Sequence, residues 1–134
     1  MLNNKLVRHI TMNEPKTKYG RIFLDFAKAL CDERYGDAYS MLSAKLRKEF
    51  NPVLLGERFM YMFNEFGDPP TEYELMEEIC DFEYDHPSYL GWAYVAISGF
   101  FKDDDIGHWS EAVSGHVISE NGMTVIDDLE WGRP

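Results

Sequence analysis

Apolar side chains recur every three or four positions through the first half of the chain, the period of an amphipathic α-helix. A second predicted helix follows Gly36, with Asp37 as its N-cap, and a third begins at Asn51 and Pro52, which suit the N-cap and first helical positions. The apolar faces of the three predicted helices carry Ile22, Phe23, Phe26, Ala27 and Leu30, then Ala38, Tyr39, Leu42, Leu46 and Phe50, then Leu55, Phe59, Met62, Phe63 and Phe66. The pattern therefore predicts three N-terminal helices within residues 20–66.

The second half of the chain changes to the period of a β-strand. The stretch GWAYVAISGFF (residues 91–101) is apolar at both its odd and its even positions. This is expected of a central strand whose two faces are both covered by other parts of the protein. Residues 108–119 predict another strand, Asn121-Gly122 a tight hairpin turn, and residues 123–131 a return strand. On the return strand the apolar residues Met123, Val125, Leu129 and Trp131 fall at alternating positions, which predicts that they share one face. The expected fold is α+β, with three N-terminal helices packed against a strongly curved antiparallel sheet of about four long strands.

These patterns also predict a core. The residues expected to be largely buried are Phe26, Leu30, Tyr39, Leu42, Phe59, Phe63, Val95, Ile97, Val117 and Val125. The chain of 134 residues has the size of one domain. We therefore expect an N-terminal arm over residues 1–17, in which KLVRHITM could add a short strand, and a single domain over residues 18–134.

One stretch, TEYELMEEICDFEYD (residues 71–85), contains seven acids in fifteen residues. A strand is favoured because Ile79, Phe82 and Tyr84 are β-formers, although residues 71–78 alone also fit a helix. With a period of two, Leu75, Glu77, Ile79, Asp81 and Glu83 share one half-acidic face. Glu77, Asp81 and Glu83 are therefore predicted to form a solvent-facing row.

Charge is unevenly divided along the chain. Residues 1–67 contain 11 Lys and Arg against 8 Asp and Glu, whereas residues 68–134 contain 2 against 16. The acidic half argues against nucleic acid as a partner, because phosphates would be repelled, and favours a basic protein surface. No apolar secretory segment or membrane span is found in the sequence, so a cytoplasmic protein without membrane contact is expected.

The order of elements resembles that of the nuclear transport factor 2-like superfamily, also called SnoaL-like or ketosteroid-isomerase-like, with a cystatin-like fold. The sequence likeness lies in FLDFAKALCDERYGDAYSMLS (residues 23–43), where an apolar helix runs into a Gly-Asp turn and an Ala-Tyr-x-x-Leu helix. The resemblance implies a cone-shaped domain with a pocket between sheet and helices. Superfamily members include isomerases, dehydratases, transport factors and immunity proteins of bacterial toxin systems, so the fold does not decide the function.

Catalysis of the ketosteroid isomerase kind needs a carboxylate base and Tyr or protonated Asp donors in an apolar pocket. The candidates are Tyr39, Tyr94, His116 and Asp127, but their spacing matches no transferable catalytic pattern. Core roles for the two tyrosines and an ordinary strand position for His116 are the favoured explanation. No cofactor is expected. No metal site is expected either, because Asp103, Asp105 and Glu111 lack the spacing of a calcium loop and the histidines lack that of a zinc site.

The remaining acids and the tryptophans suggest a binding surface, because aromatic anchors within a field of carboxylates suit a basic partner. The predicted partner-binding residues are Glu77, Asp81, Glu83, Trp92, Asp103, Asp104, Asp105, Trp109, Asp128 and Glu130. The sequence therefore favours a non-catalytic protein-binding domain, most concretely an immunity protein that neutralises a basic toxin. Three alternatives remain: a protein with a small-ligand pocket, an isomerase or dehydratase, and a sheet face that is solvent-exposed and binds no partner. Whether the protein forms a homodimer is left open.

Overall fold

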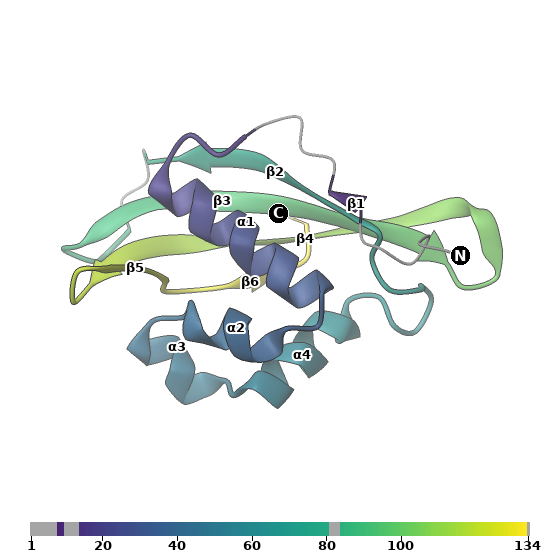
Figure 1. Cartoon of the computed structure of the whole chain (residues 1–134), viewed down its shortest axis with the longest axis horizontal. Helices are drawn as coiled ribbons and strands as arrows, with labels where there is room; N and C mark the ends of the chain where they lie inside the picture. The colour runs from purple at the N-terminus through teal and green to yellow at the C-terminus, as the bar shows by residue number, and fades with distance from the viewer. Residues whose placement is uncertain (1–7, 10–13, 81–83, 134) are drawn as a thin grey trace.

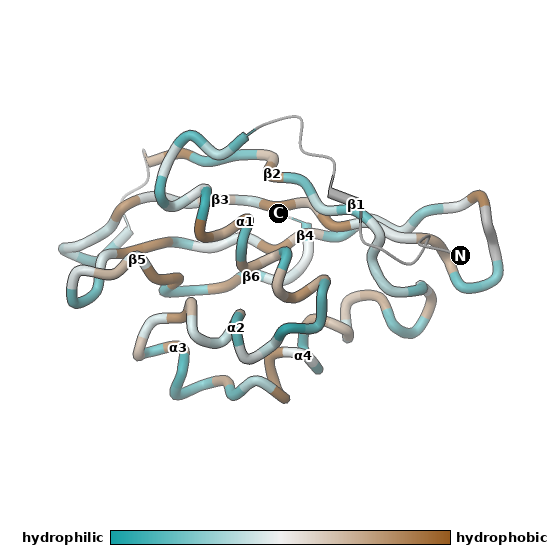
Figure 2. The backbone as a smooth tube through the Cα atoms, in the orientation of Figure 1, coloured by the Kyte–Doolittle hydropathy of each residue, from teal (hydrophilic) through white to brown (hydrophobic). Residues whose placement is uncertain are grey.

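The computed structural model describes residues 8–9, 14–80 and 84–133, without the side chains of residues 8, 9, 104 and 105. Apart from one two-residue strand, the helices of this part come first and the strands follow, so the fold is α+β (Figure 1). The helices are α1 (Lys18–Cys31), α2 (Tyr35–Ser40), α3 (Ala44–Glu49) and α4 (Pro52–Tyr61). Figure 2 shows hydrophobic residues recurring between hydrophilic ones along both the helices and the long strands.

Helix α1 follows the predicted apolar pattern. Thr17 is its N-cap, and the Thr17 side chain accepts a hydrogen bond from the Gly20 backbone N–H at 2.9 Å. Phe23, Phe26 and Leu30 have no exposed surface, and the helix packs against strands β2 and β3 (Figure 1). Full burial of each such side chain stabilises the fold by about 1.5–3 kcal/mol, so this apolar face fixes α1 to the sheet.

The second predicted helix is in fact two short helices. Residues 41–43 interrupt it, because the Ser43 N–H donates to the Ile126 carbonyl (2.7 Å) and the Ile126 N–H donates to the Met41 carbonyl (2.9 Å). This strand-like pairing competes with the helical hydrogen bonds, and Ser43 then caps α3. The predicted N-cap at Asp37 is wrong, since α2 begins at Tyr35 and Asp37 lies within its first turn.

Helix α4 begins as predicted. The Asn51 side chain accepts from the Leu54 N–H at 2.8 Å, and Pro52 occupies the first turn. The helix ends at Tyr61, so the predicted apolar face is not continued by helix to Phe66. Phe66 is 42% exposed and contacts the ring of Phe101 at a centroid distance of 6.0 Å.

The strands form one sheet in the order β1-β2-β3-β4-β5, with β6 paired to β4. They are β1 (Arg8–His9), β2 (Glu72–Ile79), β3 (Tyr89–Phe101), β4 (Asp104–Glu120), β5 (Met123–Ile126) and β6 (Glu130–Trp131). All described pairs are antiparallel except β1 with β2, which is parallel. The short strand expected in the N-terminal arm is thus present as β1.

The Asn121-Gly122 hairpin is confirmed, with φ values of 54° and 79° at the two turn residues. The return strand is not continuous, because residues 127–129 separate β5 from β6. Its predicted alternation is therefore wrong at Met123, which is 63% exposed while Val125 is 5% exposed.

The core lies mainly between α1 and one face of the sheet. Nine of the predicted core residues are buried: Phe26, Leu30, Leu42, Phe59, Phe63, Val95, Ile97, Val117 and Val125. Tyr39 is only half-buried, because its hydroxyl reaches the exposed carbonyl of Arg47 at 3.4 Å. Nine of the ten residues that periodicity predicted to be buried are therefore confirmed.

Candidate functional site

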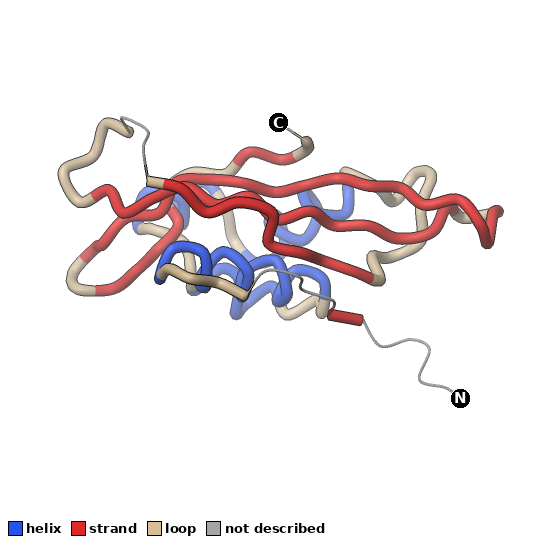
Figure 3. The backbone as a smooth tube through the Cα atoms, turned by 90° about the horizontal axis from the view of Figure 1, so that it is seen from above, coloured by secondary structure: helices blue, strands red, loops and turns tan. Residues whose placement is uncertain are grey.

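The two faces of the sheet have different neighbours. On β3, Ala93, Val95 and Ile97 are fully buried and belong to the core beside α1. The alternate residues Trp92 and Tyr94 are half-buried and point to the opposite face. Figure 3 shows α1 on one side of the strands and the C-terminal segment on the other. We call this opposite face, represented by Trp92 and Tyr94, the outer face.

A row of four residues crosses the outer face. Glu77 on β2 pairs with Tyr94 on β3, Tyr94 pairs with Ser114 on β4, and Ser114 pairs with Glu130 on β6. Directly paired residues project to the same face of a sheet. The chain therefore sets a tyrosine and a serine between two carboxylates, and both Glu77 and Glu130 are exposed. We call these four residues the outer row.

A β-bulge gives Glu77 its place in the outer row. The register shifts between Leu75, which pairs with Val95, and Glu77, which pairs with Tyr94, so Met76 is the extra residue. Leu75 is buried in the core, whereas Glu77 is exposed. The predicted common face of Leu75 and Glu77 is therefore wrong, because the bulge turns every later side chain of the strand to the other face.

The same bulge turns Glu78 inward. Its carboxylate accepts hydrogen bonds from the backbone N–H groups of Lys16 (2.9 Å) and Thr17 (3.0 Å) and from the Thr17 hydroxyl. A carboxylate beside the first turn of α1 is favourably placed in the field of the helix. Glu78 thus joins β2 to the start of α1, a role that sequence periodicity did not indicate.

A second set of polar groups lies beside the outer row. Trp92 pairs with His116, and the rings of Trp92 and Tyr94 are 6.1 Å apart. The Asp128 carboxylate accepts from the His116 backbone N–H at 2.6 Å and lies 3.0 Å from Nδ1 of its ring. A shallow pocket of about 180 Å³ is lined by Trp92, Gly115, His116, Asp128, Leu129 and Glu130. Three predicted partner-binding residues, Trp92, Asp128 and Glu130, are therefore close together here.

Tyr84 covers His116 on this side of the sheet. The two rings are stacked with centroids 4.2 Å apart, and the Tyr84 hydroxyl donates to Oδ2 of Asp127 at 2.9 Å. Lys45 on α3 places its Nζ 3.2 Å from the same oxygen. We call Lys45, Tyr84, His116, Asp127 and Asp128 the Tyr84 cluster.

The Tyr84 cluster perturbs the acidity of its members. Burial by itself would raise the pKa of Asp127, but hydrogen bonds from Ser43, Tyr84 and Lys45 and the Lys45 charge together hold it below its ordinary value. Burial, the hydrogen bond to Asp127 and the nearby carboxylates raise the pKa of Tyr84 to about 12. An ionised Asp127 and a neutral phenol are thus the stable pair at neutral pH, and the cluster holds the chain after β2 against the sheet.

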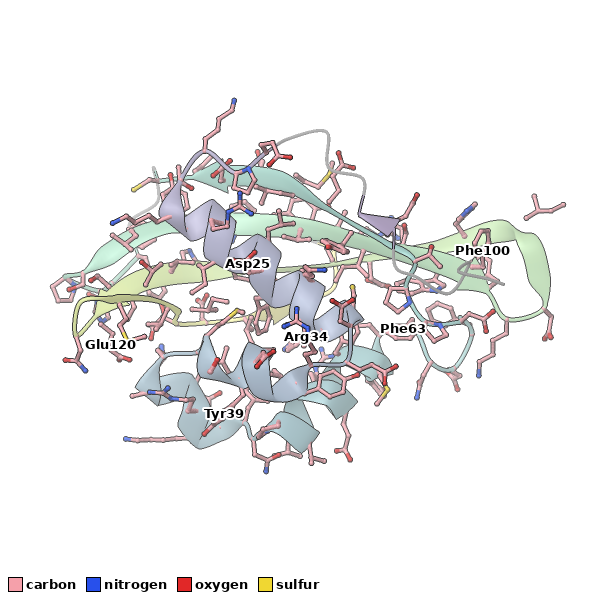
Figure 4. All side chains as sticks on the ribbon, in the orientation of Figure 1. Asp25, Arg34, Tyr39, Phe63, Phe100 and Glu120 are labelled. Atoms are coloured by element: carbon pink, nitrogen blue, oxygen red, sulfur yellow. The ribbon has the colours of Figure 1, made fainter. Side chains whose placement is uncertain are left out.

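Among the predicted catalytic candidates, the structure brings together only His116 and Asp127. Tyr94 lies in the outer row, and Tyr39 lies on α2, away from the sheet (Figure 4). Lys45 and Tyr84 were not identified from the sequence. Their only signal was general, a cation in the basic half of the chain and an aromatic residue in an acidic stretch, and neither points to Asp127.

The predicted partner-binding residues do not form one surface. Trp109 is 2% exposed, stacks on Phe63 at 4.6 Å and donates to the Asp68 carbonyl, so its prediction as a surface anchor is corrected. Asp103 lies in the β3–β4 turn beyond Phe100, at the opposite end of the molecule from Glu120 (Figure 4). Asp81 and Glu83 fall outside the described residues, as do the side chains of residues 104 and 105 (Asp104 and Asp105).

The described residues contain no group of three or more His, Cys, Asp or Glu side chains arranged to hold a metal ion. None of their helices combines the length and apolar character needed to cross a membrane.

Comparison with known proteins identifies the type of fold. Neither the family models nor the curated proteins gave a match to this chain. A solved structure with a similar fold is the solution structure of a SEC-C motif-containing protein from Rhodopseudomonas palustris, with a TM-score of 0.55 over 81% of this chain and 74% of that chain. The sequence identity is 12%, so this likeness concerns the fold alone.

Proposed function

We propose that this chain is a non-catalytic protein-binding domain of the nuclear transport factor 2-like kind, which holds a basic partner on the outer face of its sheet. The observation that carries the proposal is the outer row, where Glu77 and Glu130 flank Tyr94. Exposed carboxylates around aromatic residues attract and orient a cationic surface, while the aromatic rings supply contact area.

The surroundings of the outer row extend this acidic character. Glu72 pairs with Ser98 and Glu74 pairs with Ala96, so both carboxylates lie on the outer face of the sheet. Asp128 lies on the other side, beside Trp92. Acidic groups thus border the half-buried Trp92 and Tyr94 from β2 and from the C-terminal segment, which supports a docking surface of one charge sign.

The most concrete form of the proposal is a cytoplasmic immunity protein that masks a basic toxin. A toxin that acts on nucleic acid needs a cationic surface, and an acidic face can cover it. Electrostatic complementarity would also speed association, which an inhibitor of a lethal enzyme requires.

Co-expression with the product of the neighbouring gene tests this proposal. We expect wild type to protect cells from that product and to bind it. The double variant Glu77→Gln/Glu130→Gln should bind at least about tenfold more weakly, because two charges facing the partner are removed. The matched control Glu65→Gln/Asp103→Asn removes two exposed charges elsewhere and should bind like wild type. Equal binding by both double variants would contradict a docking role for the outer face.

A second candidate function is a small-ligand site or an isomerase or dehydratase, and the Tyr84 cluster favours it. It combines a carboxylate of lowered pKa, a histidine and a tyrosine within hydrogen-bonding or stacking distance. These groups already satisfy one another, as expected of a structural contact, and we therefore place this function second. Isomerase or dehydratase turnover that is lost in His116→Ala or Asp127→Asn, with the fold retained, would reverse the order.

A further inference from the structure

The hydroxyl of Ser114 is a buried polar group of the outer row without a hydrogen-bond partner among the described residues. Ser114 has no exposed surface, and its Oγ makes no hydrogen bond to any residue that the structure describes. Leaving a buried hydroxyl unpaired costs about 1–3 kcal/mol, and most buried polar groups in folded proteins are satisfied. An unsatisfied hydroxyl at this position therefore needs an explanation.

The neighbours of Ser114 define what could satisfy it. It lies between Tyr94 and Glu130 in register, and Tyr94 is followed by Glu77. Adjacent strands are about 4.8 Å apart, so the row from Glu77 to Glu130 spans about 14 Å, and both glutamate side chains are long enough to reach toward its centre. A group entering between Tyr94 and Glu130 would meet an aromatic ring, two carboxylates and a hydroxyl.

We propose that the outer row receives an arginine side chain of the partner. Its guanidinium stacks on Tyr94, donates hydrogen bonds to the carboxylates of Glu77 and Glu130, and donates one to Oγ of Ser114. This inference rests on the proposed function, because it names the partner group that the acidic outer face binds.

Arginine fits this arrangement better than lysine does. A guanidinium is planar, stacks on aromatic faces and carries five N–H donors in a fixed geometry, so it can serve both carboxylates and the hydroxyl at once. An ammonium group is compact and strongly hydrated, with three donors, and it gains less from a ring face. The Glu130 side chain is exposed, so its carboxylate is accessible to a guanidinium that approaches the outer row.

The test uses two short peptides that differ at one residue, acetyl-Gly-Arg-Gly-amide and acetyl-Gly-Lys-Gly-amide, titrated at low salt into ¹⁵N-labelled protein. We expect the arginine peptide to shift the amide signals of Tyr94 and Ser114 and to bind at least fivefold more tightly than the lysine peptide. Glu77→Gln/Glu130→Gln should abolish these shifts, and the control Glu65→Gln/Asp103→Asn should keep them. Ser114→Ala removes an unpaired hydroxyl, so it should fold at least as stably as wild type and should reduce the preference for arginine.

The outcomes separate this inference from the proposed function. Equal binding of the two peptides at the outer row would overturn the arginine preference and leave a general cation-binding face intact. An unchanged arginine preference in Ser114→Ala, or shifts confined to other parts of the sheet, would also overturn it. The co-expression assay decides the proposed function independently, because it depends on the native partner and not on a single side chain.

Discussion

Two neighbouring glutamates of β2 show how environment decides the role of a residue. Glu77 is exposed on the outer face, while Glu78 accepts hydrogen bonds from Lys16 and Thr17 at the start of α1. Their side chains are chemically identical and point to opposite faces because they are adjacent on the strand, and the bulge at Met76 decides which of the two faces outward. A carboxylate in solvent contributes to association, whereas one bonded to backbone N–H groups contributes to stability.

Glu78→Gln should lower the free energy of unfolding by roughly 1–3 kcal/mol, because it weakens charged hydrogen bonds that join β2 to α1. Urea unfolding at neutral pH measures the loss. Glu77→Gln is the matched control and should change stability by less than about 0.5 kcal/mol, or raise it slightly by relieving repulsion. A larger loss in Glu77→Gln than in Glu78→Gln would contradict the assigned register.

Asp127→Asn should cost about 1.5–3 kcal/mol at pH 7, since Asp127 is buried and bonded to Tyr84 and Lys45. Because the folded pKa of Asp127 lies below its ordinary value, its contribution is complete above the unfolded pKa of about 3.9. The contribution is lost as pH falls from there through the lower folded pKa. The stability difference between wild type and variant should therefore shrink in acid, which urea unfolding at a series of pH values would measure.

The control for that series is Asp25→Asn. The Asp25 side chain is 48% exposed and lies 3.9 Å from Arg21, so its loss should cost below about 0.5 kcal/mol at any pH tested. If the difference in the free energy of unfolding between wild type and Asp127→Asn stayed constant down to strong acid, the charge of the carboxylate would contribute nothing to stability.

At the scale of elements, the break between α2 and α3 shows a helix pattern overridden by a strand. Leu42 is fully buried, as its helical periodicity predicts, but its backbone forms a bridge with Ile126 of β5. Ser43 can cap a new helix there, which makes the interruption inexpensive. The apolar pattern thus correctly predicted that these side chains are buried, but it wrongly predicted a continuous helix between them.

The contact between the residues after α4 and strand β4 gives an element-scale prediction. Phe63 is 4% exposed and stacks on Trp109, so Phe63→Ala should cost about 3–5 kcal/mol through the cavity it leaves. Phe66→Ala, three residues on at a 42% exposed position, should cost less than about 1.5 kcal/mol. Thermal or urea unfolding of the pair measures both. Similar losses in the two variants would contradict the separation of core and surface at the end of α4.

At the scale of the whole molecule, the basic and acidic halves of the sequence become different parts of the fold. The basic residues of the first half include Lys45, Arg47 and Lys48 on α3, while Glu72, Glu74 and Glu77 lie on β2. The ion pair of Lys45 with Asp127 is one point where the two parts meet. The unequal distribution of charge along the chain thus becomes unequal in space, with Glu72, Glu74 and Glu77 on the face that we propose for docking.

The salt dependence of association tests this whole-molecule view. If the partner is basic, its association rate with wild type should fall steeply as ionic strength rises, because screening shortens the range of attraction. Glu77→Gln/Glu130→Gln should lower the rate at low salt by about tenfold and flatten this dependence, measured by stopped-flow mixing. Parallel salt curves for wild type and the double variant would place the attraction elsewhere.

The sequence by itself determined the features that depend on near neighbours. The apolar period of α1, the Asn51-Pro52 start of α4 and the Asn121-Gly122 hairpin each need only a few adjacent residues, so local preference was sufficient to predict them. The α+β class follows from the same signals, since a helical period in the first half and a strand period in the second persist over many residues.

Only the tertiary structure decided the candidate site. The bonds from Tyr84 to Asp127 and from Lys16 to Glu78 join residues 43 and 62 positions apart, and the outer row depends on the register of four strands and on one bulge. Register and bulges come from packing across the whole sheet, and a shift of one residue exchanges the two faces. The sequence could therefore show that Glu77, Tyr94, Ser114 and Glu130 lie on strands, but only the packed sheet could align them in one row.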